Sequence, residues 1–214
     1  MSALIELLSG DFLPRFLAGM AVNFEIAAIA LVMGLALGLL LAAGRLAGGA
    51  AAAITVSIIA LMRAAPTFVV MFFLLNAIPR DATLLGVPFA LSGVMTVALS
   101  LVPYSAAYVA DAGVDGVGHL RTGSTHGALL FFPNVTRAFF VMVMSSSAGA
   151  AIGVTEGITV ILRQAEQLSS FDDRLVLFAL GIVLFGIPLQ AGFALMSLFQ
   201  RRFGRSTVEE EASA

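Results

Sequence analysis

Several polar side chains that could contact a solute lie within, or within reach of, long apolar runs of this sequence. They are Arg63, Asn76, Tyr104, Ser145, Ser146, Ser147 and Glu156, with Pro66 close after the arginine. The guanidinium of Arg63 suits a carboxylate, because charge-assisted hydrogen bonds join the two groups well. It equally suits the carbonyl groups that a helix break at Pro66 would leave free. Glu156 either contributes to a solute pathway or lies in an outer loop, solvated or touching a binding protein.

No set of side chains in the sequence has the composition of a catalytic or metal centre. His119 and His126 stand seven residues apart with acidic residues nearby, but isolated histidines in a loop are more often solvated than metal-bound. The glycine-rich segment 113–118 lacks the lysine and hydroxyl residue of a phosphate loop, and we interpret it as a flexible turn. There is no cysteine, which excludes disulfides and thiolate sites. We therefore predict no enzyme, and we expect any nucleotide on another chain.

The composition places the chain in the membrane class. Sixty per cent of its residues are hydrophobic and 11% are charged, whereas soluble domains carry about 25% charged residues. The mean hydropathy is +1.04. The formal net charge of -2 gives no reason to expect a nucleic-acid partner.

Apolar runs divide the chain into about five membrane spans, each near the roughly 20 residues that a helix needs to cross a bilayer. The sequence predicts an all-α polytopic domain over residues 1–214, with spans at 16–43, 50–78, 89–110, 138–154 and 175–198. Pro66 should bend or break the second span. Gly34 and Gly38 should let another helix approach the first span closely. Asn23 and Glu25 either both face water or the membrane interface, or Glu25 faces the interior of the bundle.

The longest polar stretch, residues 111–137, is predicted to be a loop on one face of the membrane. Five spans put the two ends of the chain on opposite faces, and arginines should concentrate inside. With the C-terminus inside, the inner face carries Arg45, Arg121, Arg137, Arg201, Arg202 and Arg205, and the outer face carries Arg15, Arg80, Arg163 and Arg174. The loop is then cytoplasmic and the N-terminus is outside. Glu6 and Asp11 interrupt the start, so we expect no cleavable signal peptide.

Three stretches resemble the five-helix permease subunits of polar-amino-acid ABC importers. The segment 63–75 is similar to the family's Arg-Gly-Thr-Pro segment and the apolar run after it. The segment 100–111 is similar to the family's run that ends Ala-Ala-Tyr-Val-Ala-Glu. The segment 152–156 is similar to the Ile-Gly and Glu-Leu that follow the family's fourth helix. The likeness covers nearly the whole chain. It implies the type I permease fold of ABC importers and a bacterial inner-membrane location.

The resemblance departs from the family pattern in the loop that couples the permease to its ATPase. His126, Gly127 and Ala128 occupy the Glu-Ala-Ala positions, counted from Gly123. Phe132-Pro133 replaces the closing Leu-Pro after only a few residues. Met144-Ser145-Ser146-Ser147 replaces a Lys-Asp-Thr-Ser run. The shortened loop indicates either divergence within the family or weak docking beside a better-equipped partner subunit.

The resemblance implies an import subunit that works by ATP-driven alternating access. Its partners would be an ABC ATPase, which holds ATP and Mg²⁺, an extracytoplasmic solute-binding protein and a second permease subunit, identical or not. No cofactor is expected on this chain. Two alternatives stay open: a non-transporting structural partner in a heterodimeric permease, and a stand-alone channel or secondary carrier.

Overall fold

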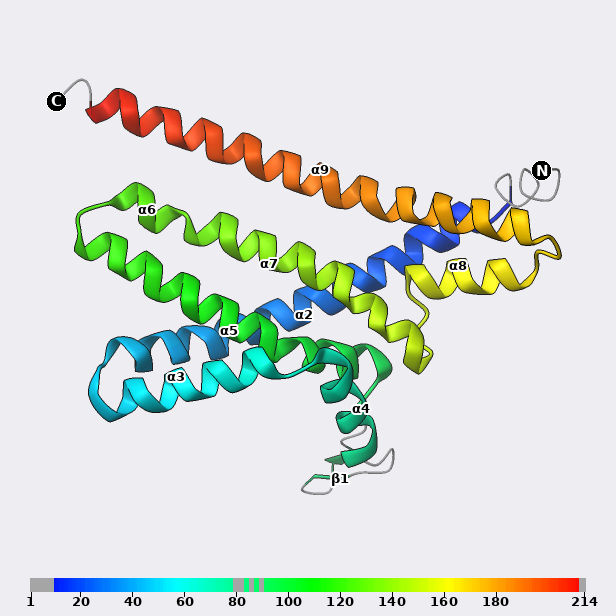
Figure 1. Ribbon diagram of the computed structural model, residues 1–214, viewed down its shortest axis with the longest axis horizontal. Helices are drawn as coiled ribbons and strands as arrows, with labels where there is room; N and C mark the ends of the chain where they lie inside the picture. Colours follow the sequence, from blue (N-terminus) through cyan, green and yellow to red (C-terminus); the bar gives the residue numbers. More distant parts are fainter. Residues whose placement is uncertain (1–9, 79–82, 85–86, 89–90, 212–214) are drawn as a thin grey trace.

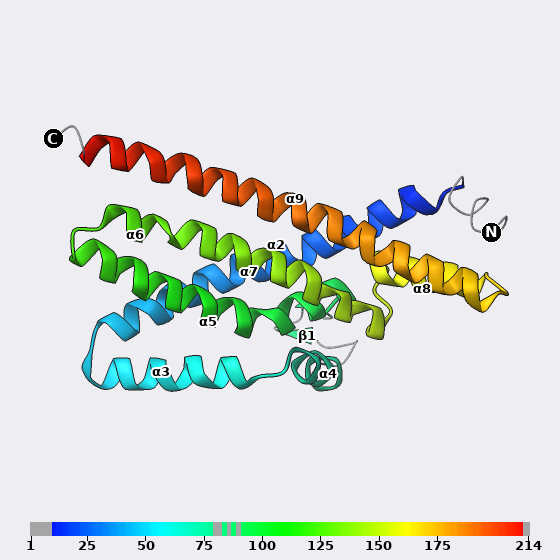
Figure 2. The ribbon, with the colours of Figure 1, turned by 45° about the horizontal axis from the view of Figure 1, so that its top comes forward.

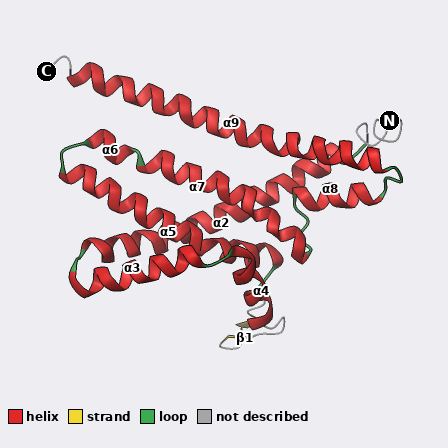
Figure 3. Ribbon diagram, viewed as in Figure 1, coloured by secondary structure: helices red, strands yellow, loops and turns green. Residues whose placement is uncertain are grey.

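The computed structural model of the protein describes residues 10–78, 83–84, 87–88 and 91–211. For His126, for the two short strands and for residues 199–211 it describes the backbone alone. The helices are α2 (Phe12–Leu46), α3 (Gly49–Ala64), α4 (Thr67–Ala77), α5 (Gly93–Arg121), α6 (Thr125–Leu129), α7 (Phe131–Ser145), the 3-10 helix η1 (Ser146–Ile152), α8 (Gly157–Glu166) and α9 (Phe171–Glu211). Between α4 and α5, β1 (Thr83–Leu84) pairs antiparallel with β2 (Val87–Pro88). Figure 3 shows how completely helix dominates the described chain, which confirms the predicted all-α class.

Four described helical segments are long and apolar enough to cross a membrane. They are Phe12–Leu46, Gly93–Arg121, Gly127–Ile152 and Phe171–Leu198, and the bent pair α3 and α4 makes a fifth if it counts as one span. In Figures 1 and 2 the turn after α2, the turn after α5 and the far end of α9 lie at one end of the bundle. The start of α2 and the connection between α8 and α9 lie at the other end.

Helices α2 and α5 form the centre of the bundle. A Cβ added at Gly34 would overlap the side chain of Ser105, and one added at Gly38 would come within 2.6 Å of the backbone oxygen of Ala106. The two glycines therefore let the helix axes approach closely, as expected of small residues four apart in a membrane helix. The predicted close approach is confirmed, and α5 is the helix that approaches.

The second apolar run is two helices that meet at an angle of 93°. Ala65 is extended at ψ 110, as the residue before a proline tends to be, and Pro66 caps the start of α4. The predicted break at Pro66 is thus confirmed. In Figure 1 α4 projects away from the bundle, and of its residues only Met71 is fully buried.

The predicted loop 111–137 is mostly helical, so its boundaries were wrong. Helix α5 continues ten residues past Asp111 to Arg121, and α7 already begins at Phe131. The segment 113–118 is therefore part of a helix and not a flexible turn. Gly113 is accommodated there because it packs against Ala42, 3.2 Å from the position its Cβ would take. Only residues 122–124 connect α5 to α6.

The last third of the chain also differs from the predicted pattern. The fourth span starts before residue 138 and tightens into η1 at Ser146. Gly153, at φ +83, then reverses the chain. The polar stretch after it contains α8, whose Ile161 and Ala165 are buried. Helix α9 packs loosely on the other helices, since only 17% of its most apolar 18-residue stretch is buried.

Candidate functional site

A buried polar network joins three parts of the chain. The side-chain amide of Asn23 on α2 donates hydrogen bonds to Ser146 Oγ at 2.8 Å and to Glu156 Oε2 at 3.0 Å. Its oxygen accepts from the backbone N–H of Gly157 at 3.0 Å. Asn23, Ser146 and Glu156 are each 0% exposed. Two predicted pathway residues, Ser146 and Glu156, thus lie together, and Asn23 is the link between them.

Glu156 is the N-cap of α8 and is fully buried, so it is not solvated. Its carboxylate accepts from the backbone N–H groups of Ile158 at 3.0 Å and Thr159 at 2.8 Å. The hydroxyl of Thr159 lies 3.0 Å from the same carboxylate. A carboxylate at a helix N-terminus is stabilised by the helix dipole and by the N–H groups that have no partner in the helix. These donors compensate for burial of the charge, so Glu156 fixes where α8 begins.

Asn23 shows why the sequence did not identify the network. It lies on the face of α2 that carries Met20, Ala27 and Ala30, all buried, at the spacing of successive helical turns. Glu25 is off this face and is exposed. Glu25 attracts more attention in the sequence because it is charged. The helical spacing of Asn23 with Met20, Ala27 and Ala30 could nevertheless have identified Asn23 as buried.

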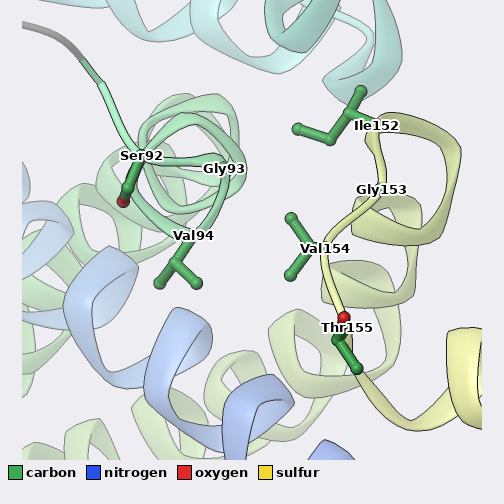
Figure 4. Close-up of a pocket in the computed structure, with 7 residues that line it drawn as sticks. All are labelled: Ser92, Gly93, Val94, Ile152, Gly153, Val154 and Thr155. Carbon is green, nitrogen blue, oxygen red and sulfur yellow. The ribbon is translucent and has the colours of Figure 1, made fainter.

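A hollow of about 300 Å³ lies beside this network. The start of α5 lines it with Ser92, Gly93 and Val94, and the turn before Glu156 lines it with Ile152, Gly153, Val154 and Thr155. Figure 4 shows the side chains of Ile152 and Val154 pointing from the turn toward the start of α5. Glu156 therefore anchors the chain segment that forms one wall of the hollow.

A second polar group lies on another side of α5. Asp111 forms ion pairs with both Arg63 on α3 and Arg45 at the end of α2, the latter at 3.0 Å. The side chains of Asp111, Arg45 and Arg63 are 35%, 39% and 56% exposed. Arg63 is thus partnered by a carboxylate and does not cap the broken helix. Neither Asp111 as a partner nor Arg45 was identified from the sequence, although a lone arginine in a span implies a partner, since it costs about 3 kcal/mol unpaired.

The other predicted pathway residues are not brought into either group. Asn76 on α4 is exposed and donates to the backbone oxygen of Phe72 at 2.6 Å. The ring of Tyr104 lies tilted beside that of Tyr108, with centroids 6.1 Å apart. Ser145 and Ser147 flank Ser146 and are half-buried, and Pro66 is exposed at the helix break.

The tip formed by α5, α6 and the first turn of α7 carries the residues predicted to couple to an ATPase. Gly123 is exposed at φ +80, and Gly127 is buried against His119 of its own chain. Ala128 and Pro133 are half-buried, while the side chain of His126 lies outside the described residues. The apolar side chains that do project are Leu120, Leu129, Leu130 and Phe132, at 56%, 47%, 41% and 66% exposed. We call these four residues the tip patch.

No model of a known protein family matches the sequence, and no curated protein matches it. The structure, however, is similar to a solved crystal structure of an amino acid ABC transporter with histidines. The match covers 90% of this chain and 95% of that chain, with a TM-score of 0.65 and 19% sequence identity. The chain has the permease fold of an ABC transporter. In this fold the hollow and the tip patch lie at opposite ends of α5, which runs from Gly93 to Arg121.

Proposed function

We propose that this chain is the membrane-spanning permease subunit of an ABC importer for polar amino acids or similar small solutes. The observation that carries the proposal is the similarity to an amino acid ABC transporter over 90% of this chain and 95% of the other. The chain would itself be no enzyme. ATP and Mg²⁺ would bind a separate ATPase, and the solute would cross by alternating access between two permease subunits in a bacterial inner membrane.

The distribution of arginines supports the orientation with the C-terminus in the cytoplasm. Arg45 and Arg121 stand at the end of the bundle where α2 and α5 finish, and α9 carries three arginines toward that same end. Arg15 and Arg174 belong to the opposite end. Because positive residues concentrate on the cytoplasmic side, the tip patch would face the cytoplasm. Arg80 lies outside the described residues.

The tip patch is the surface we propose for the ATPase. It consists of apolar side chains at the end of a helix pair, and exposed apolar groups that are rimmed by polar ones commonly mark protein contacts. Because α5 and α7 both run from this patch into the bundle, a displacement of the tip moves both helices. A rigid-body transmission of this kind is what alternating access requires.

The hollow at the start of α5 is the surface we propose for the outer, solute-receiving side. It lies at the opposite end of α5 from the tip patch. The predicted solute-binding protein would release its cargo here. The buried Asn23–Glu156 bond keeps one wall of the hollow in place while the helices move.

Affinity purification from the native membrane tests the proposal. A tagged copy of the chain should retain an ATPase that hydrolyses MgATP, and a copy with Phe132→Asp should retain much less. The tagged chain purified free of partners should hydrolyse no ATP. Robust ATP hydrolysis by the chain alone would overturn the assignment.

One observation favours the alternative of a non-transporting structural partner. Helix α6 has five residues, and its Gly127 packs against His119 of the same chain, so little of α6 is left to enter a groove on an ATPase. A structural partner would co-purify with a second, different permease and would still support uptake after the tip patch is made polar. An importing subunit would lose uptake with the same change.

A further inference from the structure

Helix α5 carries a stripe of polar side chains on the side away from α2. Tyr104, Tyr108, Asp111 and Asp115 follow each other at spacings of four, three and four residues, which places them on one helix face. The tyrosines and Asp111 are half-buried and Asp115 is exposed. The face toward α2 is different, because Ser105, Ala106 and Val109 on it are fully buried.

Two arginines from neighbouring helices reach this stripe. Arg63 and Arg45 both contact the carboxylate of Asp111. A guanidinium has five N–H donors, and one shared carboxylate cannot satisfy two guanidinium groups. At 56% and 39% exposed, the two side chains keep donors that are open to another acceptor.

The position of the stripe excludes lipid as its neighbour. Arg63 lies about 21 Å of helix beyond the first residue of α3, on a segment that belongs to a candidate span. Ionised side chains within spans face protein or a water-filled cavity, because hydrocarbon cannot solvate them. The stripe is only partly covered on this chain, so water must reach it between this subunit and whatever covers it.

The charges of the stripe are balanced. Arg45 and Arg63 supply two positive groups, and Asp111 and Asp115, one helical turn apart, supply two negative ones. A solute that carries a single charge would leave one group of the Arg63–Asp111 pair without a partner. A solute with both charges can exchange with the pair, since its carboxylate takes the guanidinium and its ammonium group takes the aspartate.

We propose that Arg63, Asp111 and their neighbours on the α5 stripe form a solute site on a water-filled route, and that this site takes zwitterions carrying one carboxylate and one ammonium group. The proposal rests on the proposed function and adds the route's location and the chemical reason for its selectivity. Tyr104 and Tyr108 would line the same route on the side toward the start of α5.

The absence of cysteine from the chain allows a direct test. In the membrane-embedded complex, Ala60→Cys places a single thiol one turn before Arg63 on α3, at an exposed position. Ile182→Cys on α9, an apolar position 75% exposed, is the control that we expect to face lipid. Two impermeant methanethiosulfonates, one with a sulfonate and one with a trimethylammonium group, are applied. When each rate is divided by that reagent's rate with a small free thiol, both reagents should modify Ala60→Cys about equally fast. Both should modify the control roughly tenfold more slowly, because hydrocarbon suppresses the reactive thiolate.

Charge variants in the Ala60→Cys background then test the site itself. Asp111→Asn should shift the ratio of rates about fivefold toward the sulfonate reagent, and Arg63→Gln about fivefold toward the ammonium reagent, as expected for one charge at close range in water. Arg63→Lys keeps the charge and should leave the ratio unchanged. A mixture of neutral L-amino acids should slow the modification, whereas the same concentration of acetate plus methylammonium should not.

Three results would overturn this inference. A thiol at position 60 that reacts no faster than the control would place the stripe away from water. If neither Arg63→Gln nor Asp111→Asn changes the ratio of the two modification rates, the Arg63–Asp111 pair does not face the route. If no L-amino acid slows the modification, the site does not bind zwitterions. Any of these together with intact ATP-driven uptake would leave the proposed function standing and reject the site alone.

Discussion

Asn23 on α2 and Glu156 at the start of α8 are joined by a 3.0 Å hydrogen bond between side chains 133 positions apart in the chain. The bond links the central helix of the bundle to the segment that walls the hollow. Both partners are fully buried, and Asn23 also accepts from Gly157. Removing one side of such a network leaves buried donors and acceptors without partners, and that loss costs more than the bond itself contributes.

The first prediction concerns the stability of this junction. Asn23→Ala leaves the backbone N–H of Gly157 without its acceptor and removes a donor from Glu156, so it should lower the free energy of unfolding by about 1–3 kcal/mol. Glu25→Gln, two residues along the same helix at an exposed position, is the matched control and should change it by less than about 0.5 kcal/mol. Thermal unfolding in detergent, followed by circular dichroism, measures both. Equal effects of the two variants would show that the network does not hold α8.

The second prediction concerns the contact between α2 and α5. Gly34→Ala should destabilise the chain by about 1–3 kcal/mol, because the new methyl group overlaps Ser105. Adding Ser105→Gly to the same chain removes the overlapping atoms and should restore part of the loss. The restoration is partial because a glycine inside a helix costs about 1 kcal/mol.

Ala36→Leu provides the comparison for this contact. Position 36 is exposed on the same helix, so a larger side chain there meets no neighbour within the chain. The same unfolding measurement applies. A Gly34→Ala variant as stable as Ala36→Leu would mean that the two central helices are not packed as closely as described.

The third prediction concerns the tip patch. Phe132 is the most exposed of its four residues, and an aromatic side chain at the centre of an interface often dominates the binding energy. Phe132→Asp should weaken retention of the ATPase about tenfold or more. Asn134→Asp adds the same charge two residues away at an exposed position and should have a much smaller effect. Titration of the purified ATPase against the immobilised chain measures both, and indistinguishable affinities would remove Phe132 from the interface.

The architecture was largely predictable because length and hydropathy determine which segments can cross a bilayer. Pro66 identified the break between α3 and α4 because a proline in this context disrupts a helix for local steric reasons. Gly34 and Gly38 indicated a close contact, although nothing in the sequence pattern identified α5 as the partner. Such pairings depend on tertiary packing and not on local preference.

The ends of the helices were less predictable. The charge of Asp111 predicts the start of a loop, but Arg45 and Arg63 neutralise it within the bundle and α5 continues. The burial of Glu156 was hard to predict for a related reason. A carboxylate that accepts backbone N–H groups at a helix start can be buried, and one of its side-chain partners, Asn23, lies 133 positions away.

Uptake by proteoliposomes tests the central claim most directly. The chain is reconstituted with the ATPase that co-purifies with it, and labelled L-amino acids are offered with the solute-binding protein on the opposite side of the membrane from MgATP. The account predicts uptake that needs MgATP, stops when the ATPase is omitted and falls with Phe132→Asp. Steady amino-acid flux through the chain alone, driven only by a solute or ion gradient, would contradict it.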